Sequence, residues 1–207
     1  NNGDHVDVLT MYRYESRKMI VEDGVRIFPI PSRQEKGNRL VYLLGYIFSF
    51  IVLEFQLTKL YLQNHYDVIH FHNMPDFLVF TGIIPKLFGA KLILDIHDPM
   101  PEMFESKFPD QRESLGMKMV RLEEKLSTAF ADEIITANPH FKRNLTSRGV
   151  QDSRITVIDN FPDLEYFCPT MRASRTDEKH NHFMLIFPGT IAPRYGLDVA
   201  IKSLPFL

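Results

Sequence analysis

Three short polar clusters each follow a run of apolar and β-branched residues, and their side chains are of the types that move protons or bind sugars. An imidazole near carboxylates or amides can transfer a proton, hydrogen-bond a hydroxyl group or ligate a metal ion. In open α/β sheets, ligands bind outside the carboxyl ends of the strands, so the clusters predict a site there. They are His70, His72 and Asn73; His97, Asp98 and Glu102; and Asn138.

The first two clusters differ in which of their side chains are expected to reach the site. Side chains alternate along a strand, so His70 and His72 share a face, and His72 lies nearer the strand end. We therefore expect His72 in the site and His70 in the core, with a backbone partner. His97, Asp98 and Glu102 form the densest group of titratable side chains. The alternative for these two carboxylates is capping of a short helix that begins near residue 102.

A fourth candidate is the loop at 189–196, between a predicted strand and a predicted helix. Gly189 lets the backbone approach a ligand, helix N–H groups face an anion, and Arg194 adds positive charge. The loop is interpreted as a diphosphate cradle, with an ordinary strand-to-helix turn as the alternative.

The scaffold for these clusters is predicted from the alternation of short β-branched runs with longer segments of helical period. This pattern is typical of strand–helix–strand units and a parallel sheet, and therefore of the α/β class. Continuous apolar character in the strands indicates burial on both faces. The predicted strands are 6–10, 25–30, 68–71, 92–96, 133–136, 155–158 and 183–187.

Two helices have clear sequence signals. A stripe at steps of three and four predicts one helix that buries this face against the sheet. A shorter helix is predicted at 139–148, because Asn138 can cap it, Pro139 suits its first position and Gly149 follows its end. The apolar stripe consists of Leu115, Met119, Leu122, Leu126 and Phe130.

Composition excludes several classes of protein. The 207 residues are 44% hydrophobic and 24% charged, which is typical of a globular domain. A formal charge of −2 provides no general basic field, so we expect no nucleic-acid partner. With Cys168 as the single cysteine, no disulfide can form within the chain. This suits a reducing compartment, and we expect a cytoplasmic protein.

Length predicts one domain and part of a second. We expect a first domain at 1–159, a polar interdomain linker at 160–181, and the opening strand, loop and helix of a second domain at 182–207. The chain is interpreted as a fragment cut at both ends.

The most apolar segment is 40–53, which is shorter than the ~20 residues that a membrane-spanning helix needs. Burial against the sheet is one interpretation. The other is peripheral contact of one helix face with a membrane or a lipid acceptor, at the inner membrane face, because Lys36, Arg39 and Lys59 flank the segment.

Five segments of the sequence carry a family resemblance when they are taken in order. They are Tyr66 to His72; Ile93 to Asp98 with Pro101 and Glu102; Ala131 to Thr136; Val157 to Asn160 with Asp163 and Phe167; and Pro188 to Asp198. Together they resemble glycosyltransferase family 4. The resemblance implies the GT-B architecture, in which two Rossmann-like domains face each other across a cleft. It also implies transfer of a sugar from a nucleotide-diphosphate sugar, with retention, to a glycan or lipid-linked acceptor. No metal or other cofactor is expected.

The resemblance also implies roles for individual residues. His97 would reach the donor sugar as the catalytic residue, and Asp98 and Glu102 would position the acceptor. The cleft would be lined by His72, Asn73 and Asn138, and the donor diphosphate would be bound by Gly189, Thr190 and Arg194. The sequence departs from the family pattern at Thr190 and Tyr195, where arginine and lysine are usual.

The family pattern further implies a strand with a glycine-rich loop before Asn1 and an acidic nucleotide-binding motif after Leu207, so we expect the chain alone to be inactive. Two other functions remain open. His70, His72, His97 and Asp98 could ligate a metal ion in a hydrolase. A sugar-nucleotide-binding module without catalysis is the second alternative.

Overall fold

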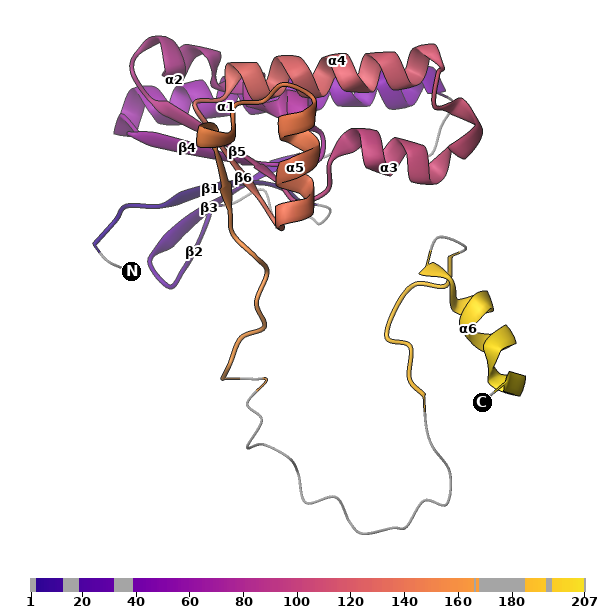
Figure 1. The fold of residues 1–207 in the computed structure, drawn as a ribbon. Coiled ribbons are helices and arrows are strands. Elements are labelled where there is room, and N and C mark those ends of the chain that lie inside the picture. Colours follow the sequence, from indigo (N-terminus) through magenta and orange to yellow (C-terminus); the bar gives the residue numbers. More distant parts are fainter. Residues whose placement is uncertain are drawn as a thin grey trace. The chain divides into compact units, whose positions relative to one another are not determined.

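The computed structural model describes residues 3–12, 19–31, 39–165, 167, 185–192 and 195–206. The chain divides into two compact units, Asn1–Asp159 and Asn160–Leu207. The first unit contains two sheets and most of the helices (Figure 1).

The larger sheet has four strands, all parallel, in the order β4-β5-β6-β7. Every connection between consecutive strands runs through helical segments, as parallel pairing requires. The parallel α/β arrangement predicted from the sequence is confirmed here. The strands are β4 (Val68–His72), β5 (Lys91–Ile96), β6 (Glu133–Thr136) and β7 (Ile155–Val157).

The smaller sheet has the order β1-β3-β2. β1 (Asp7–Tyr12) pairs in parallel with β3 (Val25–Pro31). β2 (Ile20–Glu22), which the sequence analysis missed, forms an antiparallel hairpin with β3. Asp23 and Gly24 at its turn both have positive φ, the conformation that two-residue hairpin turns require.

A polar network joins the two sheets where β1 and β4 begin. Arg26 donates two hydrogen bonds to Asp7, at 2.7 and 2.6 Å, and a third to Asn64 at the end of α1. The Tyr66 hydroxyl, just before β4, also donates to Asp7. Among the described strands, β1 and β4 each pair on one side only.

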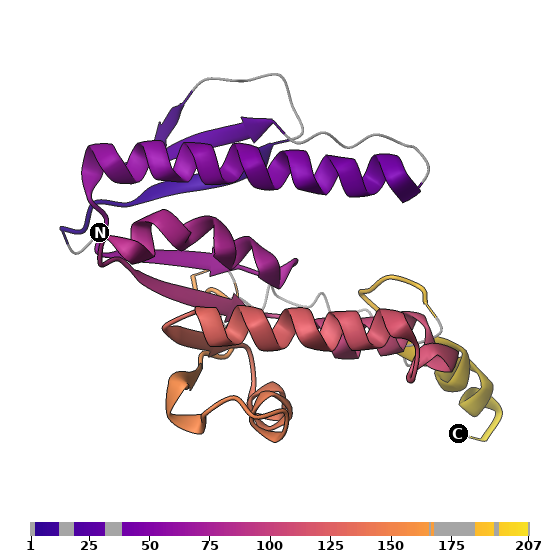
Figure 2. The same cartoon turned by 90° about the horizontal axis from the view of Figure 1, so that it is seen from above.

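A layer of helical segments lies along one side of the larger sheet, the upper side in Figure 1, and Figure 2 shows η1 and α2 between α1 and α4. Leu92, Leu94, Ile96 and Ile134 form the centre of the core beneath them. The elements of this layer are α1 (Arg39–Asn64), η1 (Asp76–Gly82), α2 (Ile83–Leu87) and α4 (Leu115–Phe130).

The remaining helices of the first unit are short. They are α3 (Met100–Lys107), η2 (Pro109–Gln111), α5 (Pro139–Ser147) and η3 (Asp152–Arg154). α5 begins and ends as predicted, to within one residue. Asn138 Oδ1 accepts a hydrogen bond from Phe141 N at 2.9 Å, and Gly149 follows the helix with a φ of 99°.

The predicted α4 has the expected bounds but buries the opposite face. Its leucine and methionine stripe is exposed, and its inward face consists of Met117, Glu124, Ser127 and Thr128. Two polar groups of this face have partners: Glu124 binds Arg148, and the Thr128 hydroxyl donates to Glu124 O. The Ser127 hydroxyl is buried without a hydrogen-bond partner among the described residues. Burial of the apolar stripe was therefore a wrong prediction.

β4 also departs from the expected burial on both faces, because Ile69 and Phe71 are buried whereas Val68, His70 and His72 are exposed. His70 is consequently not a core histidine.

In the second unit, α6 (Leu197–Ser203) begins at the predicted residue and is followed by η5 (Leu204–Phe206). Residues 185–187 form no strand, contrary to the prediction for 183–187, whose first two residues lie outside the described part. Most of the predicted linker at 160–181 lies outside it as well.

Segment 40–53 is the first half of α1, which buries Leu53, Leu57, Leu60 and Tyr61 against the rest of the first unit. The side of α1 that faces away from these residues is exposed. No helix among the described residues has the length and apolar character needed to cross a bilayer.

Candidate active site

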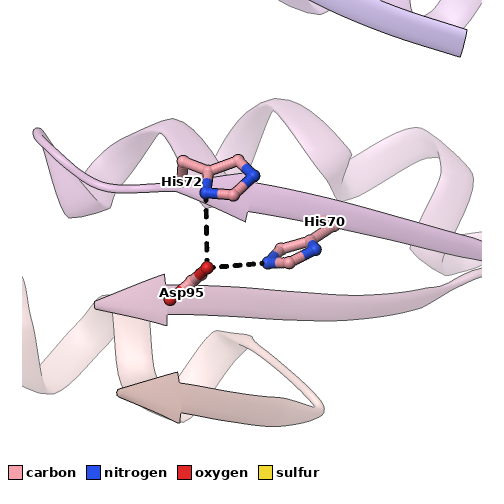
Figure 3. A group of neighbouring side chains, drawn as sticks. All are labelled: His70, His72 and Asp95. Atoms are coloured by element: carbon pink, nitrogen blue, oxygen red, sulfur yellow. Dashed lines mark hydrogen bonds and ion pairs between the residues drawn. The ribbon is translucent and has the colours of Figure 1, made fainter. Parts of the chain in front are cut away.

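Four titratable side chains share one face at the carboxyl ends of β4 and β5. His72 is the register partner of Asp95 on the neighbouring parallel strand, so their side chains lie next to each other. His70 precedes His72 by two residues, and His97 follows Asp95 by two. Figure 3 shows His70 and His72 reaching Asp95 from β4.

One oxygen of Asp95 is the centre of this cluster. Asp95 Oδ2 lies 3.2 Å from His70 Nε2, 3.3 Å from His72 Nδ1 and 3.1 Å from His97 Nε2. The rings of His70 and His72 stack, with centroids 4.4 Å apart. The Asp95 side chain is 9% exposed, whereas those of His70 and His97 are each 40% exposed. A buried carboxylate thus supports imidazoles that remain accessible to a ligand.

The two oxygens of Asp95 differ in their surroundings. Oδ2 lies within hydrogen-bond distance of His70 Nε2 and His97 Nε2. Oδ1 is buried without a hydrogen-bond partner among the described residues. Burial lowers the pKa of His72, and nearby His70 lowers it further, against the attraction of Asp95.

Asn73 fixes the loop that follows β5. Its Oδ1 accepts a hydrogen bond from His97 N at 3.0 Å, and its Nδ2 donates to Asp98 O at 2.7 Å. The same Nδ2 donates to Asp76 Oδ1 at 3.1 Å. The side chain predicted to line a cleft therefore holds the backbone of His97 in position.

Asp76 lies beneath this loop and is fully buried. Burial raises its pKa to about 7, and the nearby carboxylate of Glu123 contributes to the increase. Asp76 is therefore partly protonated near neutral pH, directly below the residue that anchors the His97 loop.

Glu102 belongs to an ion-pair network that joins three helices. It accepts hydrogen bonds from Asn144 Nδ2 at 2.6 Å and Arg148 Nη1 at 2.9 Å. Arg148 also binds buried Glu124, with Nε 2.5 Å from Oε1. Burial raises the pKa of Glu124, and Arg148 opposes this increase. These contacts link α3, α4 and α5.

Asp98 and Asn138 differ in how many of their polar side-chain atoms already have hydrogen-bond partners. Asp98 is exposed, and its carboxylate makes no hydrogen bond or ion pair with any described residue. Asp98 does not cap α3, whose N-cap residue is Pro99. The Asn138 oxygen caps α5, so its amide N–H groups remain for a ligand.

The residues predicted to bind a diphosphate belong to the second unit. Gly189 and Thr190 are exposed, and Gly189 N donates to Phe187 O at 3.1 Å in a tight turn. Arg194 lies outside the described residues. The diphosphate-binding role of all three stays a prediction.

The cluster also has the donor set of a metal site. Ligand atoms of His70, His72 and Asp95 all lie within 4.8 Å of one another. Two imidazoles and a carboxylate suit zinc or manganese. The acidic member is Asp95, not the Asp98 considered in the sequence analysis.

Asp95 is the main residue that sequence reasoning missed. A charged residue within the apolar run Ile93, Leu94 and Ile96, two positions before His97, was the available signal. Nothing in the sequence fixes the register that brings His72 opposite Asp95, so the cluster itself was not predictable.

Residues 1–160 match the family described as "Glycosyl transferase 4-like domain". The match covers most of the 207 residues, and the chain belongs to this family. The first unit is accordingly a Rossmann-like α/β domain of the GT-B type, and glycosyl transfer is its general function. No curated protein matches the sequence.

Proposed function

We propose that the chain is part of a retaining glycosyltransferase that moves a sugar from a nucleotide-diphosphate sugar to a glycan or lipid-linked acceptor, with His97 as the catalytic residue. The observation that carries this proposal is the contact of half-exposed His97 with buried Asp95 at the end of β5. Neighbouring strand ends are where open α/β sheets bind ligands.

The chemistry of the reaction explains the use of this pair. Cleavage of the donor leaves negative charge on the diphosphate and positive charge on the sugar ring. A preoriented imidazole beside the ring stabilises that charge distribution without reorganising in the transition state. Asp95 holds the ring of His97, and Asn73 holds its backbone, so both are positioning residues.

We assign the donor diphosphate to Gly189, Thr190 and Arg194, and the acceptor side to Asp98, with His72 and Asn138 lining the cleft. Support for Asp98 comes from its exposed carboxylate next to His97. Glu102 binds Arg148 and so ties α3, the helix that follows Asp98, to α4 and α5; direct contact of Glu102 with the acceptor remains a prediction. The reaction proceeds without a metal ion in this proposal.

Segment 40–53 is the part of the chain that we propose for peripheral membrane contact, at the cytoplasmic face, where a lipid-linked acceptor would lie. The exposed side of α1 supports this assignment, because Leu44, Phe48 and Ile51 are each 45–58% exposed.

The test uses the intact protein and a panel of nucleotide-diphosphate sugars in isothermal calorimetry, followed by turnover assays with the donor that binds. We expect binding of one donor, and a product whose anomeric configuration, determined by NMR, matches that of the donor. Inversion would contradict the retaining mechanism.

Each alternative function gives a different result. Binding without turnover on any glycan or lipid-linked acceptor would favour the binding module. A metal-dependent hydrolase would release free sugar, lose activity on treatment with EDTA and regain it with one equivalent of metal. A metal-independent transferase retains its activity after the same treatment.

A further inference from the structure

The outward side of α4 is an apolar stripe that the fold leaves uncovered. It lies opposite the buried Met117 and Glu124, so it is not a partly formed core face. Monomeric proteins rarely expose contiguous apolar surface of this kind without a binding role. The stripe consists of Leu115 at 74%, Met119 at 63%, Leu122 at 55% and Leu126 at 51% exposure.

The exposed charges on α4 itself have one sign. Lys118, Arg121 and Lys125 are exposed on the same helix. Its two carboxylates turn away: Glu123 accepts a hydrogen bond from Phe77 N at 2.8 Å, and Glu124 binds Arg148. Lys118 and Lys125 form no ion pair with any described residue. The exposed side of α4 is thus apolar and basic, with its acids used internally.

α1 lies on the same side of the sheet as α4 (Figure 2) and carries a second stripe of exposed apolar residues. Its members follow one another at steps of three, four and seven residues, and all are exposed. They are Leu44, Phe48, Ile51, Phe55 and Leu62. Lys59 is exposed near the end of this stripe, and the single carboxylate of α1, Glu54, is half-buried. The two helices, with η1 and α2 between them, form what we call the α1–α4 face.

We propose that the α1–α4 face binds the surface of an anionic phospholipid bilayer. Leucine-rich helices flanked by lysine and arginine lie in the interface of such membranes, with their apolar sides in the acyl region and their cations among the lipid phosphates. A second copy of the chain fits less well, because apposed faces would bring the basic side chains of both α4 helices together. This inference extends the membrane contact proposed for 40–53 to a second helix and to a charge-selective surface.

The test is flotation of the protein with vesicles of phosphatidylcholine alone or with 30% phosphatidylglycerol, without donor or acceptor. We expect selective binding to the anionic vesicles that weakens as salt increases. Lys118→Gln with Lys125→Gln should reduce this binding by about 20- to 30-fold, since each basic residue near the surface contributes about fivefold. Arg143→Gln with Lys91→Gln, both in the first unit but outside the face, removes the same charge and should leave binding unchanged.

Leu122→Ser with Leu126→Ser should reduce vesicle binding, whereas Val68→Ser with Ile158→Ser, also exposed apolar positions of the first unit, should not. The sequence has no tryptophan. Met119→Trp should therefore show a blue-shifted emission on anionic vesicles, and Ile158→Trp should not.

Equal binding of both charge variants, or no emission shift at Met119→Trp, would overturn the inference. Self-association in sedimentation that the α4 variants abolish, without vesicle binding, would assign the face to a second copy and overturn it as well. None of these measurements depends on glycosyl transfer. A protein that does not transfer sugar could therefore still bind vesicles, and failure of the proposed function is distinguishable from failure of this inference.

Discussion

Asp95 and His97 stand two residues apart where β5 ends, and their side chains meet with 3.1 Å between Asp95 Oδ2 and His97 Nε2. Asp95 is buried and cannot reach a substrate, whereas His97 is half-exposed. The pair therefore separates two tasks: the carboxylate orients the imidazole, and the imidazole meets the ligand.

Substitution of Asp95 tests this division. Asp95→Asn should lower kcat by roughly 100-fold with little change in the KM for the donor, because His97 loses its orientation and not its presence. The same variant should lower the pKa of His72 further, as measured by NMR titration, since the attraction of the carboxylate is removed. Asp67→Asn, an exposed position just before β4, is the matched control. Unchanged kcat in Asp95→Asn would show that Asp95 does not position His97.

Asp76 should make the protein less stable as pH rises. Its pKa is about 7 in the folded state against 3.8 for the free group, so the folded state holds the extra proton between these values. The contribution of protonated Asp76 to the free energy of unfolding is complete below pH ~4 and disappears as the pH rises to ~7. This contribution is at most about 4 kcal/mol, because the pKa differs by about three units between the two states. Asp76→Asn should remove this decrease in stability between pH ~4 and pH ~7. The measurement is the free energy of unfolding of both proteins in urea at pH 5 and pH 8. Parallel pH profiles of the wild type and Asp76→Asn would contradict the buried, protonated state.

The ion-pair network of Glu102 predicts effects on stability. Arg148→Met leaves Glu124 buried without its partner and should destabilise the fold by about 3–5 kcal/mol in chemical denaturation. Arg143→Met, an exposed position on the same helix, should cost less than ~0.5 kcal/mol. Glu102→Gln should cost about 1 kcal/mol, because the charge that binds Arg148 is lost, and the KM for the acceptor is measured in parallel. An increase in that KM without loss of stability would assign Glu102 to the acceptor.

Sequence alone predicted those elements whose signals are local. The bounds of α4 and α5 follow from apolar spacing and from caps, and Asp23 with Gly24 was a hairpin signal that was present but not used. The inward face of α4 was not predictable in this way, because Glu124 is buried only through Arg148, which is distant in sequence.

The same limit applies to the site. The shared face of His70 and His72 follows from strand alternation, but their meeting with Asp95 depends on the register of β4 against β5. Because β4 and β5 are parallel, no hairpin turn fixes that register. Sequence therefore predicted the end of the sheet at which these histidines lie, but not the carboxylate that they share.

The most direct test of the central claim is transfer by the His97→Ala variant of the intact protein, with donor binding measured in parallel by calorimetry. We predict that transfer falls by at least about 100-fold, because the group beside the reacting sugar is lost. Donor affinity should change little. Turnover equal to that of the wild type would contradict the assignment of His97 as the catalytic residue.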